Sequence, residues 1–304
     1  MILEDFLEGL PGKPSFQIRR YEDVNPVSGA QKVRILSIPN DAMRILHARI
    51  VKFLRRLPVD HSISTGARPK WSPRRNTSIH SGHRYLYATD ISRAYESVDG
   101  QRLAGVLCAF AESLLGNEQS VFQFLKTYCL GPSSGLAVGA PASPDLFNVY
   151  SAVLIDQPLI KYCRENRLTV TRYLDDVTVS ADHPIGKRKR KAIRLIIQRA
   201  GFSINHWKSS VLDLRRGTTM VTGVGLNRDG RLFVPRHFLR KIKGILLLAK
   251  DDPLEFEKKA SGVMSVFFAT RKPRESYNRT ERRIFDLWSE FRLRLAQEKS
   301  RGRR

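Results

Sequence analysis

The sequence feature that most constrains the fold is a pair of adjacent acids between two short β-prone runs. Asp175 and Asp176 end the tetrapeptide Tyr-Leu-Asp-Asp, with residues 170–172 before it and residues 177–179 after it. Two carboxylates at the bend of a hairpin repel each other, and a bound divalent cation removes that repulsion. The pattern therefore predicts a tight hairpin with an ion-binding turn; a solvated acidic turn is the alternative.

A third acid strengthens this interpretation. Asp90 ends the β-prone run 85–89, so we expect it at the end of a second strand. One acid that closes a strand and two acids at a neighbouring hairpin form the ligand set of a two-metal phosphoryl-transfer site. Hard carboxylate oxygens suit Mg²⁺, so the sequence predicts two Mg²⁺ ions bound by Asp90, Asp175 and Asp176. The simpler alternative is that Asp90 caps a turn and the acidic pair only solvates the hairpin.

The charge of the chain indicates a polyanionic partner. Its 304 residues include 53 Lys and Arg against 29 Asp and Glu, for a formal net charge of +24. Nucleic acid is the leading candidate, and a generally basic solvated surface is the alternative. The basic run 187–191 fits either a phosphate-binding face or a solvated helix end.

Nothing in the sequence suggests a membrane. The longest aliphatic run lies near residues 245–249, which is too short to cross a bilayer, and Glu4, Asp5 and Glu8 argue against a signal peptide. The three cysteines are scattered without metal-ligand spacing, as in a reducing compartment. We expect a cytoplasmic protein without a membrane partner.

The apolar pattern predicts an α+β fold. The first unit has a short helix, strands at 16–20 and 32–38 around a Pro26/Gly29 turn, a helix at 41–57 and a basic loop at 61–75. From about 76 to 227, strands and helices alternate, as in a small antiparallel sheet backed by helices.

The remaining chain is expected to be helical from about residue 234. One face of its last helix carries Ile284, Trp288, Phe291 and Leu295 at helical spacing. Residues 299–304 resemble a frayed basic tail.

Four segments resemble the palm motifs of reverse transcriptases, in the expected order along the chain. Residues 90–95 (Asp-Ile-Ser-Arg-Ala-Tyr) and 173–176 are similar to the first and third motifs. Residues 139–144 (Gly-Ala-Pro-Ala-Ser-Pro) with Asn148 resemble the second motif of the bacterial branch. Residues 201–208 contain the Gly, the short strand, the Asn and the Lys of the fourth.

Two shorter segments resemble signatures of retron reverse transcriptases. Residues 76–80 (Asn-Thr-Ser-Ile-His) are similar to the Asn-Ala-x-x-His signature, with Thr77 in place of Ala, and residues 221–223 match the Val-Thr-Gly triplet before the thumb. We expect these segments to hold a dedicated RNA, Gly223 by allowing close backbone approach. The alternative is that the first pair braces the fingers and the triplet ends a strand. The residues expected to contact RNA are Asn76, His80, Val221, Thr222 and Gly223.

The resemblance also implies substrate contacts. The ring of Tyr95 is expected under the sugar of the incoming nucleotide, where it excludes a 2′-hydroxyl. Gly139 and Ser143 belong to the loop that approaches a base or the template. Arg34 resembles the fingers arginine that clamps the triphosphate, and Lys208 is expected to pair with or protonate the leaving pyrophosphate. A core tyrosine, a plain loop-to-helix turn and a surface lysine are the ordinary alternatives.

Two departures from the family pattern affect nucleotide binding. Ala137 and Val138 precede Gly139 where the family usually has Pro-Gln, and valine cannot form the hydrogen bond of that glutamine. The fingers turn, residues 25–27, reads Asn-Pro-Val and lacks the basic residue that is common there. Both departures leave the three acids unchanged.

The resemblance implies a right-hand polymerase with an antiparallel palm sheet and a helical thumb. We expect fingers at 1–75, a palm at 76–230 with a fingers insertion at about 100–140, and a thumb with a basic tail at 231–304. The implied activity is RNA-templated DNA synthesis from dNTPs with Mg²⁺. A retron enzyme further implies a structured non-coding RNA as template and primer, a branched RNA–DNA product and antiphage defence, with an effector protein as a candidate partner.

Two alternatives remain open at this point. One is a defence or abortive-infection reverse transcriptase with relaxed or untemplated synthesis, which Val138 and the altered fingers turn favour. The other is a catalytically idle RNA-binding scaffold, against which the three intact aspartates argue.

Overall fold

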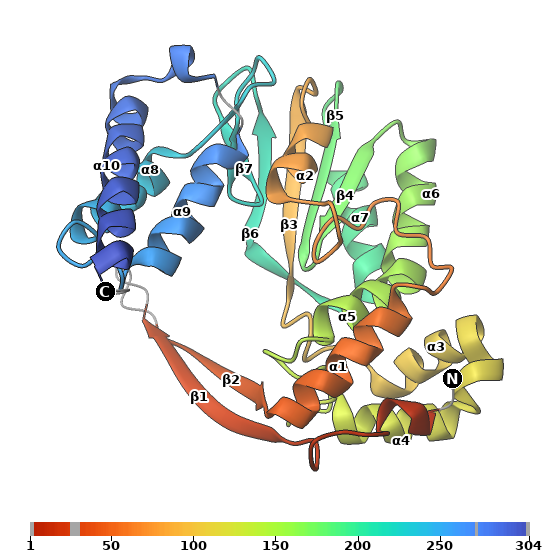
Figure 1. Ribbon diagram of the computed structural model, residues 1–304. Coiled ribbons are helices and arrows are strands. Elements are labelled where there is room, and N and C mark those ends of the chain that lie inside the picture. Colours follow the sequence, from red (N-terminus) through yellow and green to blue (C-terminus); the bar gives the residue numbers. More distant parts are fainter. Residues whose placement is uncertain (1–2, 25–30, 271–272, 302–304) are drawn as a thin grey trace. The chain divides into compact units, whose positions relative to one another are not determined.

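The computed structural model describes residues 3–24, 31–270 and 273–301 (Figure 1). Its contacts divide the chain into two compact units, one of Met1–Ser72 with Tyr85–Val211 and the other of Pro73–Arg84 with Leu212–Arg304. The segment that precedes the expected palm strand thus belongs, by its contacts, with the C-terminal region. The expected fingers, palm and thumb limits are functional divisions and stay predictions.

The first unit begins with a 3₁₀ turn, Leu3–Phe6, and the antiparallel hairpin of β1 (Phe16–Val24) and β2 (Gln31–Pro39). The expected Pro26/Gly29 turn and the departure at residues 25–27 lie outside the described residues. Helix α1 (Asp41–Leu54) follows, because the side chain of Asn40 accepts a hydrogen bond from the Met43 amide and caps it. The helix ends at Leu54, earlier than the expected residue 57.

A four-stranded sheet lies at the centre of this unit, in the order β4-β5-β3-β6. The strands are β3 (Tyr85–Ser92), β4 (Thr169–Tyr173), β5 (Asp176–Ala181) and β6 (Ser203–Asp213), and β5 runs antiparallel to both β3 and β4. Strand β6 begins at Ser203, within the segment 201–208 that was expected to contain a short strand, and continues to Asp213. The sheet confirms the antiparallel α+β prediction.

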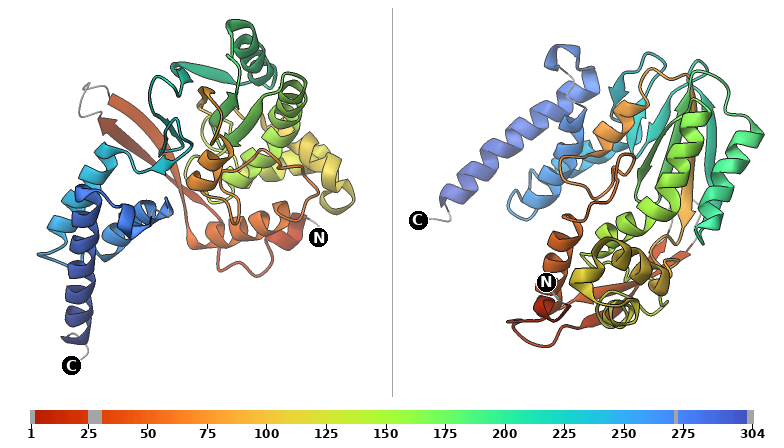
Figure 2. Two further views of the ribbon diagram at one scale, coloured as in Figure 1. Left: turned by 90° about the horizontal axis from the view of Figure 1, so that it is seen from above. Right: turned by 90° about the vertical axis from the view of Figure 1, so that its right-hand side faces the viewer.

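The helical segments that follow share one continuous core with the sheet. They are α3 (Gly100–Leu115), α4 (Glu118–Tyr128), α5 (Ser143–Ser151), a π-helical turn (Ala152–Asp156), α6 (Gln157–Glu165) and α7 (Lys187–Arg199). Figure 2 shows helices lying along one face of this sheet. Buried Val177 and Val179 of β5 share the core with Leu159 of α6 and Ile197 of α7, so the sheet is held from that side.

The second unit joins a short helix and a small sheet to a helical bundle. Helix α2 (Pro73–Ile79) lies in part of the segment expected as a loop, because Pro73 suits a first helical position. Strands β7 (Thr219–Val221), β8 (Val224–Leu226) and β9 (Leu232–Phe233) form an antiparallel sheet. The region of alternating strands and helices, expected to reach about residue 227, thus ends in a β-hairpin.

The bundle consists of α8 (Arg236–Leu248), α9 (Glu257–Ala269), a 3₁₀ turn (Arg274–Ser276) and α10 (Arg279–Arg301). The expected apolar face of α10 is confirmed, since Ile284, Phe291 and Leu295 are buried and Trp288 packs against them. Fraying from residue 299 is wrong as far as Arg301, because Lys299 forms an ion pair of 2.6 Å with Glu257 of α9. No helix in the described ranges combines the length and apolarity needed to cross a membrane.

Candidate active site

The sheet brings the three acids to one edge. Asp90 of β3 lies directly opposite Asp176 of β5 in the strand register. Asp175 lies in the two-residue turn between β4 and β5, and its carbonyl oxygen accepts a hydrogen bond of 2.9 Å from the Ile91 amide. Strand pairing thus places residues from two distant motifs side by side, as the sequence predicted.

This edge concentrates negative charge. The pKa of Asp176 is raised to about 6, first by burial and then by the neighbouring carboxylates of Asp175 and Asp90. Asp90 is itself buried. Such a set is stabilised by a cation, and its hard oxygens match what a divalent ion prefers.

The three carboxylates do not by themselves form a complete metal-binding site. Among the described residues, no three His, Cys, Asp or Glu side chains are already arranged to hold a metal ion. An ion such as Mg²⁺ commonly binds through one or two carboxylates and takes its other ligands from substrate phosphates and water. The donor chemistry of the edge therefore fits a divalent cation that shares its ligands with a substrate.

Lys208 of β6 belongs to the same edge. Its ammonium group donates a hydrogen bond of 3.0 Å to Oδ1 of Asp90, and more than half of its side chain is exposed. The lysine also opposes the rise in the pKa of Asp176. In this structure Lys208 compensates the charge of an acid, while its exposed side remains accessible to an anionic group.

Tyr95 lies near the acidic turn. Burial raises the pKa of its hydroxyl to about 12, and the charge of Asp175 is the next contribution. Its ring packs edge-on against Phe147 of α5 at 5.6 Å, and its carbonyl accepts a hydrogen bond from the Leu136 amide. The tyrosine is thus held from two sides, and its expected contact with a sugar stays a prediction.

A glycine that the sequence reasoning missed supports this arrangement. A Cβ atom on Gly135 would overlap the backbone of Glu96, the residue after Tyr95. The visible signal was the segment Gly-Pro-Ser-Ser-Gly at 131–135, but its partner could not be identified without the fold.

The loop of the second motif is tied to β2. Gly139 has a φ of 95°, so its backbone conformation does favour glycine. The Ser143 hydroxyl is buried and donates to the Ala137 carbonyl at 2.7 Å, and the Ser37 amide of β2 donates to the Val138 carbonyl at 2.8 Å. The hydroxyl of Ser143 therefore closes the loop, whereas the expected role was a substrate contact.

Two basic groups expected to meet polyanions are exposed or half-exposed. Arg34 is exposed on β2, opposite Tyr21 of β1. The basic run 187–191 forms the first turns of α7, whose buried face is carried instead by Ile193 and Ile197. Both positions are accessible to a nucleic acid or nucleotide phosphate.

The two retron-like segments contact each other in the second unit. The Thr77 hydroxyl of α2 donates to the Val221 carbonyl at 2.9 Å, and the Asn76 amide donates to the Thr222 hydroxyl at 3.3 Å. Thr222 in turn donates to the Pro73 carbonyl at 3.3 Å. Thr77, the position that differs from the family signature, thus supplies a buried hydrogen bond that an alanine could not make.

Burial separates the five residues expected to contact RNA into two groups. Asn76, His80 and Val221 are buried, and burial lowers the pKa of His80 to about 3, so its imidazole is neutral. Thr222 and Gly223 form the turn between β7 and β8, and both have positive φ angles of 46° and 82°. No atom lies within 4 Å of a Cβ on Gly223, so the turn, rather than a close approach within the protein, explains this glycine.

Comparison with known proteins identifies one family. Residues 21–228 match the family model described as Reverse transcriptase (RNA-dependent DNA polymerase). Retron Ec83 reverse transcriptase of Escherichia coli is 23% identical over 261 residues, which cover 82% of this chain and 81% of that protein. Retron Mx65 reverse transcriptase of Myxococcus xanthus is 29% identical over 241 residues, which cover 71% of this chain but 53% of that protein.

A solved structure shares the fold. Telomerase from Candida tropicalis, in complex with a TWJ fragment of telomeric RNA, superposes with a TM-score of 0.50 at 11% identity. The match covers 84% of this chain and 53% of that chain. At this identity the likeness concerns the fold alone.

Proposed function

Because the chain belongs to the reverse transcriptase (RNA-dependent DNA polymerase) family and is a retron-type member with the right-hand polymerase fold, we propose that it makes a branched RNA–DNA product. A structured non-coding RNA serves as template and primer, and dNTPs are the substrates. The two retron reverse transcriptases among its relatives support this proposal. The same resemblance suggests a role in antiphage defence with an effector protein as a further partner.

The observation that carries the catalytic part is the meeting of Asp90, Asp175 and Asp176 at one sheet edge. Reverse transcriptases generally use divalent metal ions, and we propose that these acids hold two Mg²⁺ ions. When bound, the ions would supply the positive charge that lowers the pKa of the attacking hydroxyl group, a 2′-hydroxyl of the RNA at the branch and the 3′-hydroxyl of the growing DNA afterwards, and that stabilises the leaving pyrophosphate.

The chain's own residues would place the substrate. The ring of Tyr95 excludes a 2′-hydroxyl by contact, which selects dNTPs over ribonucleotides. The guanidinium of Arg34 binds the triphosphate, and the exposed ammonium of Lys208 pairs with the charge of the departing pyrophosphate. The backbone at Gly139 approaches the template or a base.

We propose that the exposed residues of the two retron-like segments contact RNA and that the buried ones have a structural role. Thr222 and Gly223 have exposed surface and meet the RNA directly, while Asn76 and the buried Val221 hold that turn and the buried His80 has a structural role in α2's neighbourhood. Loop and unpaired segments of RNA are recognised by small and polar groups of this kind. Lys and Arg, including the run 187–191, supply the phosphate contacts.

Primer extension tests the proposal against its alternatives. RNA that co-purifies with the protein is sequenced and used, with Mg²⁺ and dNTPs, beside a generic primed RNA template. Preferred extension on the co-purified RNA, with a product that keeps a 2′,5′ branch, is the expected result. Equal extension on both, or incorporation without a template, supports the relaxed enzyme; no extension on any primed RNA supports the idle scaffold.

The salt dependence of RNA binding tests the phosphate contacts separately. Because counterions are released from RNA, the affinity should fall steeply between low and moderate salt. Charge reversal across residues 187–191 should reduce that slope if α7 touches phosphate. A flat salt dependence would contradict binding through the basic surface.

A further inference from the structure

A fully buried ion pair lies behind the catalytic turn. Arg172 of β4 and Asp156 of the π-helical turn have side chains that are 0% and 1% exposed. Nε and Nη2 of the arginine donate to the two carboxylate oxygens at 2.7 and 2.8 Å. Burial raises the pKa of Asp156, and the arginine opposes that shift. Removing two charges from water is unfavourable, so such a pair is a poor device for stability alone.

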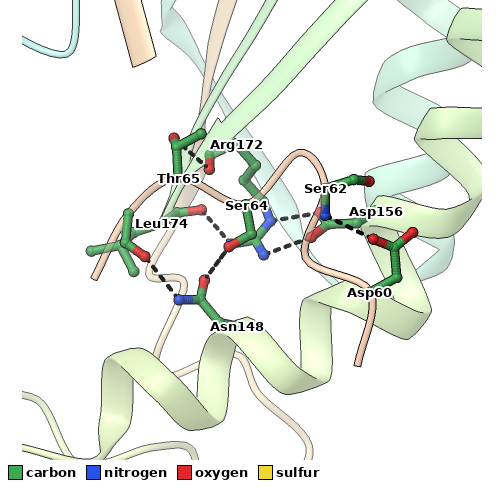
Figure 3. Close-up of polar contacts among 9 residues, drawn as sticks. Asp60, Ser62, Ser64, Thr65, Asn148, Asp156, Arg172 and Leu174 are labelled. Atoms are coloured by element: carbon green, nitrogen blue, oxygen red, sulfur yellow. Dashed lines mark hydrogen bonds and ion pairs between the residues drawn. The ribbon is translucent and has the colours of Figure 1, made fainter. Parts of the chain in front are cut away.

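The rest of the guanidinium group points at the turn, as Figure 3 shows. Its Nη1 donates to the Asn148 side-chain oxygen and to the Leu174 carbonyl, both at 3.1 Å. Leu174 directly precedes Asp175 and has a φ of 55°, a left-handed conformation that is strained for a leucine. The arginine therefore stabilises the one strained residue of this hairpin.

A loop from a distant part of the sequence closes the same cluster (Figure 3). Thr65 donates its amide to the Arg172 carbonyl at 2.8 Å, and the Ser64 hydroxyl donates to Asn148 at 2.9 Å. The amide of Asn148 donates in turn to the Gly66 carbonyl at 2.9 Å. Asn148 thus links the arginine to the loop.

Gly66 packs directly against the turn. A Cβ atom at this position would lie 2.7 Å from both the backbone nitrogen and Cγ of Leu174. Those distances are far below van der Waals contact, and one of them involves backbone that cannot rotate away. Only a residue without a side chain lets the loop reach the turn.

We propose that Arg172, Asp156, Asn148 and Gly66 form a seat that positions the catalytic turn. By holding the Leu174 carbonyl and the backbone before Asp175, the seat orients the carboxylate of Asp175 relative to Asp90 on the neighbouring strand. These are positioning residues, since they act through the turn. The inference rests on the proposed catalytic role of the acids.

Gly66→Ala tests the seat without touching a charged group, and Gly100→Ala is its matched control. Gly100 is also a buried glycine of the same unit, and a Cβ there would likewise meet an atom at 2.7 Å, but that atom is a side-chain methyl of Leu130. The melting temperature, the kcat and KM for dNTP, and the amide hydrogen exchange of residues 174–176 are measured for both variants.

We expect Gly66→Ala to lower kcat by about 10- to 100-fold, as for other small misplacements of catalytic groups, with a dNTP KM within about twofold of wild type. Exchange of the turn amides should accelerate in the ion-free protein. Gly100→Ala should lower the melting temperature without either change. If the two variants lose kcat equally at equal melting temperature, the seat is only core packing and the inference is wrong.

Arg172→Lys supplies an independent test, because lysine keeps the charge but lacks the fork that reaches Asp156, Asn148 and Leu174 together. Like Gly66→Ala, it should lower kcat while leaving the KM for dNTP nearly unchanged, and it should accelerate the amide exchange of residues 174–176. Should this variant fail to fold, Gly66→Ala still decides the question. If Gly66→Ala leaves the amide exchange of residues 174–176 unchanged, the seat is wrong, whether or not the protein extends a primed RNA. If the exchange changes but the wild-type protein extends no primed RNA, only the proposed function is wrong.

Discussion

Two tight hairpin turns, one in each compact unit, both require a backbone with a positive φ angle, and different contacts stabilise that angle in each. Each joins antiparallel strands through two residues, Leu174-Asp175 in the first and Thr222-Gly223 in the second. Positive φ angles occur in both. In the second turn a glycine takes the larger positive φ in open space, and Thr222 takes the smaller one while hydrogen-bonded to Asn76 and Pro73. In the first turn a leucine has the positive φ, and tertiary contacts with Arg172 and Gly66 hold it there.

The groups that hold the two turns also differ in charge. The first turn carries acids and is held by a buried ion pair, whereas the second is held by neutral hydrogen bonds from Thr77 and Asn76. A charged turn that must present carboxylates in one direction gains from a rigid support that local sequence does not provide. A turn that closes a hairpin needs only a glycine and a few neutral contacts.

The largest expected difference between the turns is in activity. Asp175→Asn should lower primer extension by at least about 100-fold, because stabilisation of the transition-state charge is lost. The fold should persist, since one of three neighbouring like charges is removed. Asp182→Asn, at an exposed position just after β5, is the control and should extend normally. More than a few per cent of wild-type turnover in the Asp175 variant would contradict the assignment.

Acid should destabilise the second unit, in which His80 is buried. Burial lowers the pKa of His80 from 6.5 to about 3, so its neutral form stabilises the fold. This contribution is complete above pH 6.5 and is lost as the pH falls from about 6.5 to 3, by a few kcal/mol in all. The free energy of unfolding of His80→Gln should depend less on pH in that window. His237→Gln, at an exposed histidine of the same unit, should behave as wild type.

Sugar selection should depend on the first turn's neighbourhood alone. Tyr95→Ala should reduce the preference for dNTP over rNTP by about 10- to 100-fold while retaining dNTP incorporation, because the ring excludes the 2′-hydroxyl by contact. Tyr162→Ala, at a partly buried tyrosine of α6, is the control. An unchanged preference in the Tyr95 variant would mean that another residue selects the sugar.

Removal of one hydroxyl group should weaken the hydrogen bonds that hold the second turn. Thr77→Val removes the hydroxyl group that reaches the carbonyls of Val221 and Pro73 and should cost about 1 to 2 kcal/mol of unfolding free energy, because a buried hydrogen bond is lost. Thr77→Ser keeps the donor and should lose much less. The comparison is made by urea unfolding, and equal losses would show that the methyl group rather than the hydrogen bond matters.

The smallest effect is expected from the local turn itself. Gly223→Ala should destabilise the protein by about 1 kcal/mol, because a Cβ disfavours the φ of 82° although the space around it is open. Gly217→Ala is the control, since its surroundings are equally open and its φ is not in that region. Equal stability of the two variants would show that the turn tolerates a side chain.

Much of the catalytic edge could be predicted from the sequence. The acids follow runs with strong β preference. Antiparallel pairing places the end of one strand beside the start of the next, so Asp90 and Asp176 were expected side by side. The amphipathic face of α10 was equally visible in its spacing. The inward hydroxyl of Ser143 and the hydrogen bond from Thr77 of α2 to Val221 were not, because the sequence does not show which carbonyl oxygen a hydroxyl group will meet.

The acids, the β-prone runs around them and the positive charge of the chain can be recognised from the amino-acid order alone, since propensity, periodicity and composition are local properties. Which groups hold the acids in place depends on how distant segments pack. Arg172 was one basic residue among many until the fold removed it from water and set Asp156, Asn148 and Leu174 around it. A buried charge needs specific partners, and which residues become its partners depends on how distant segments pack.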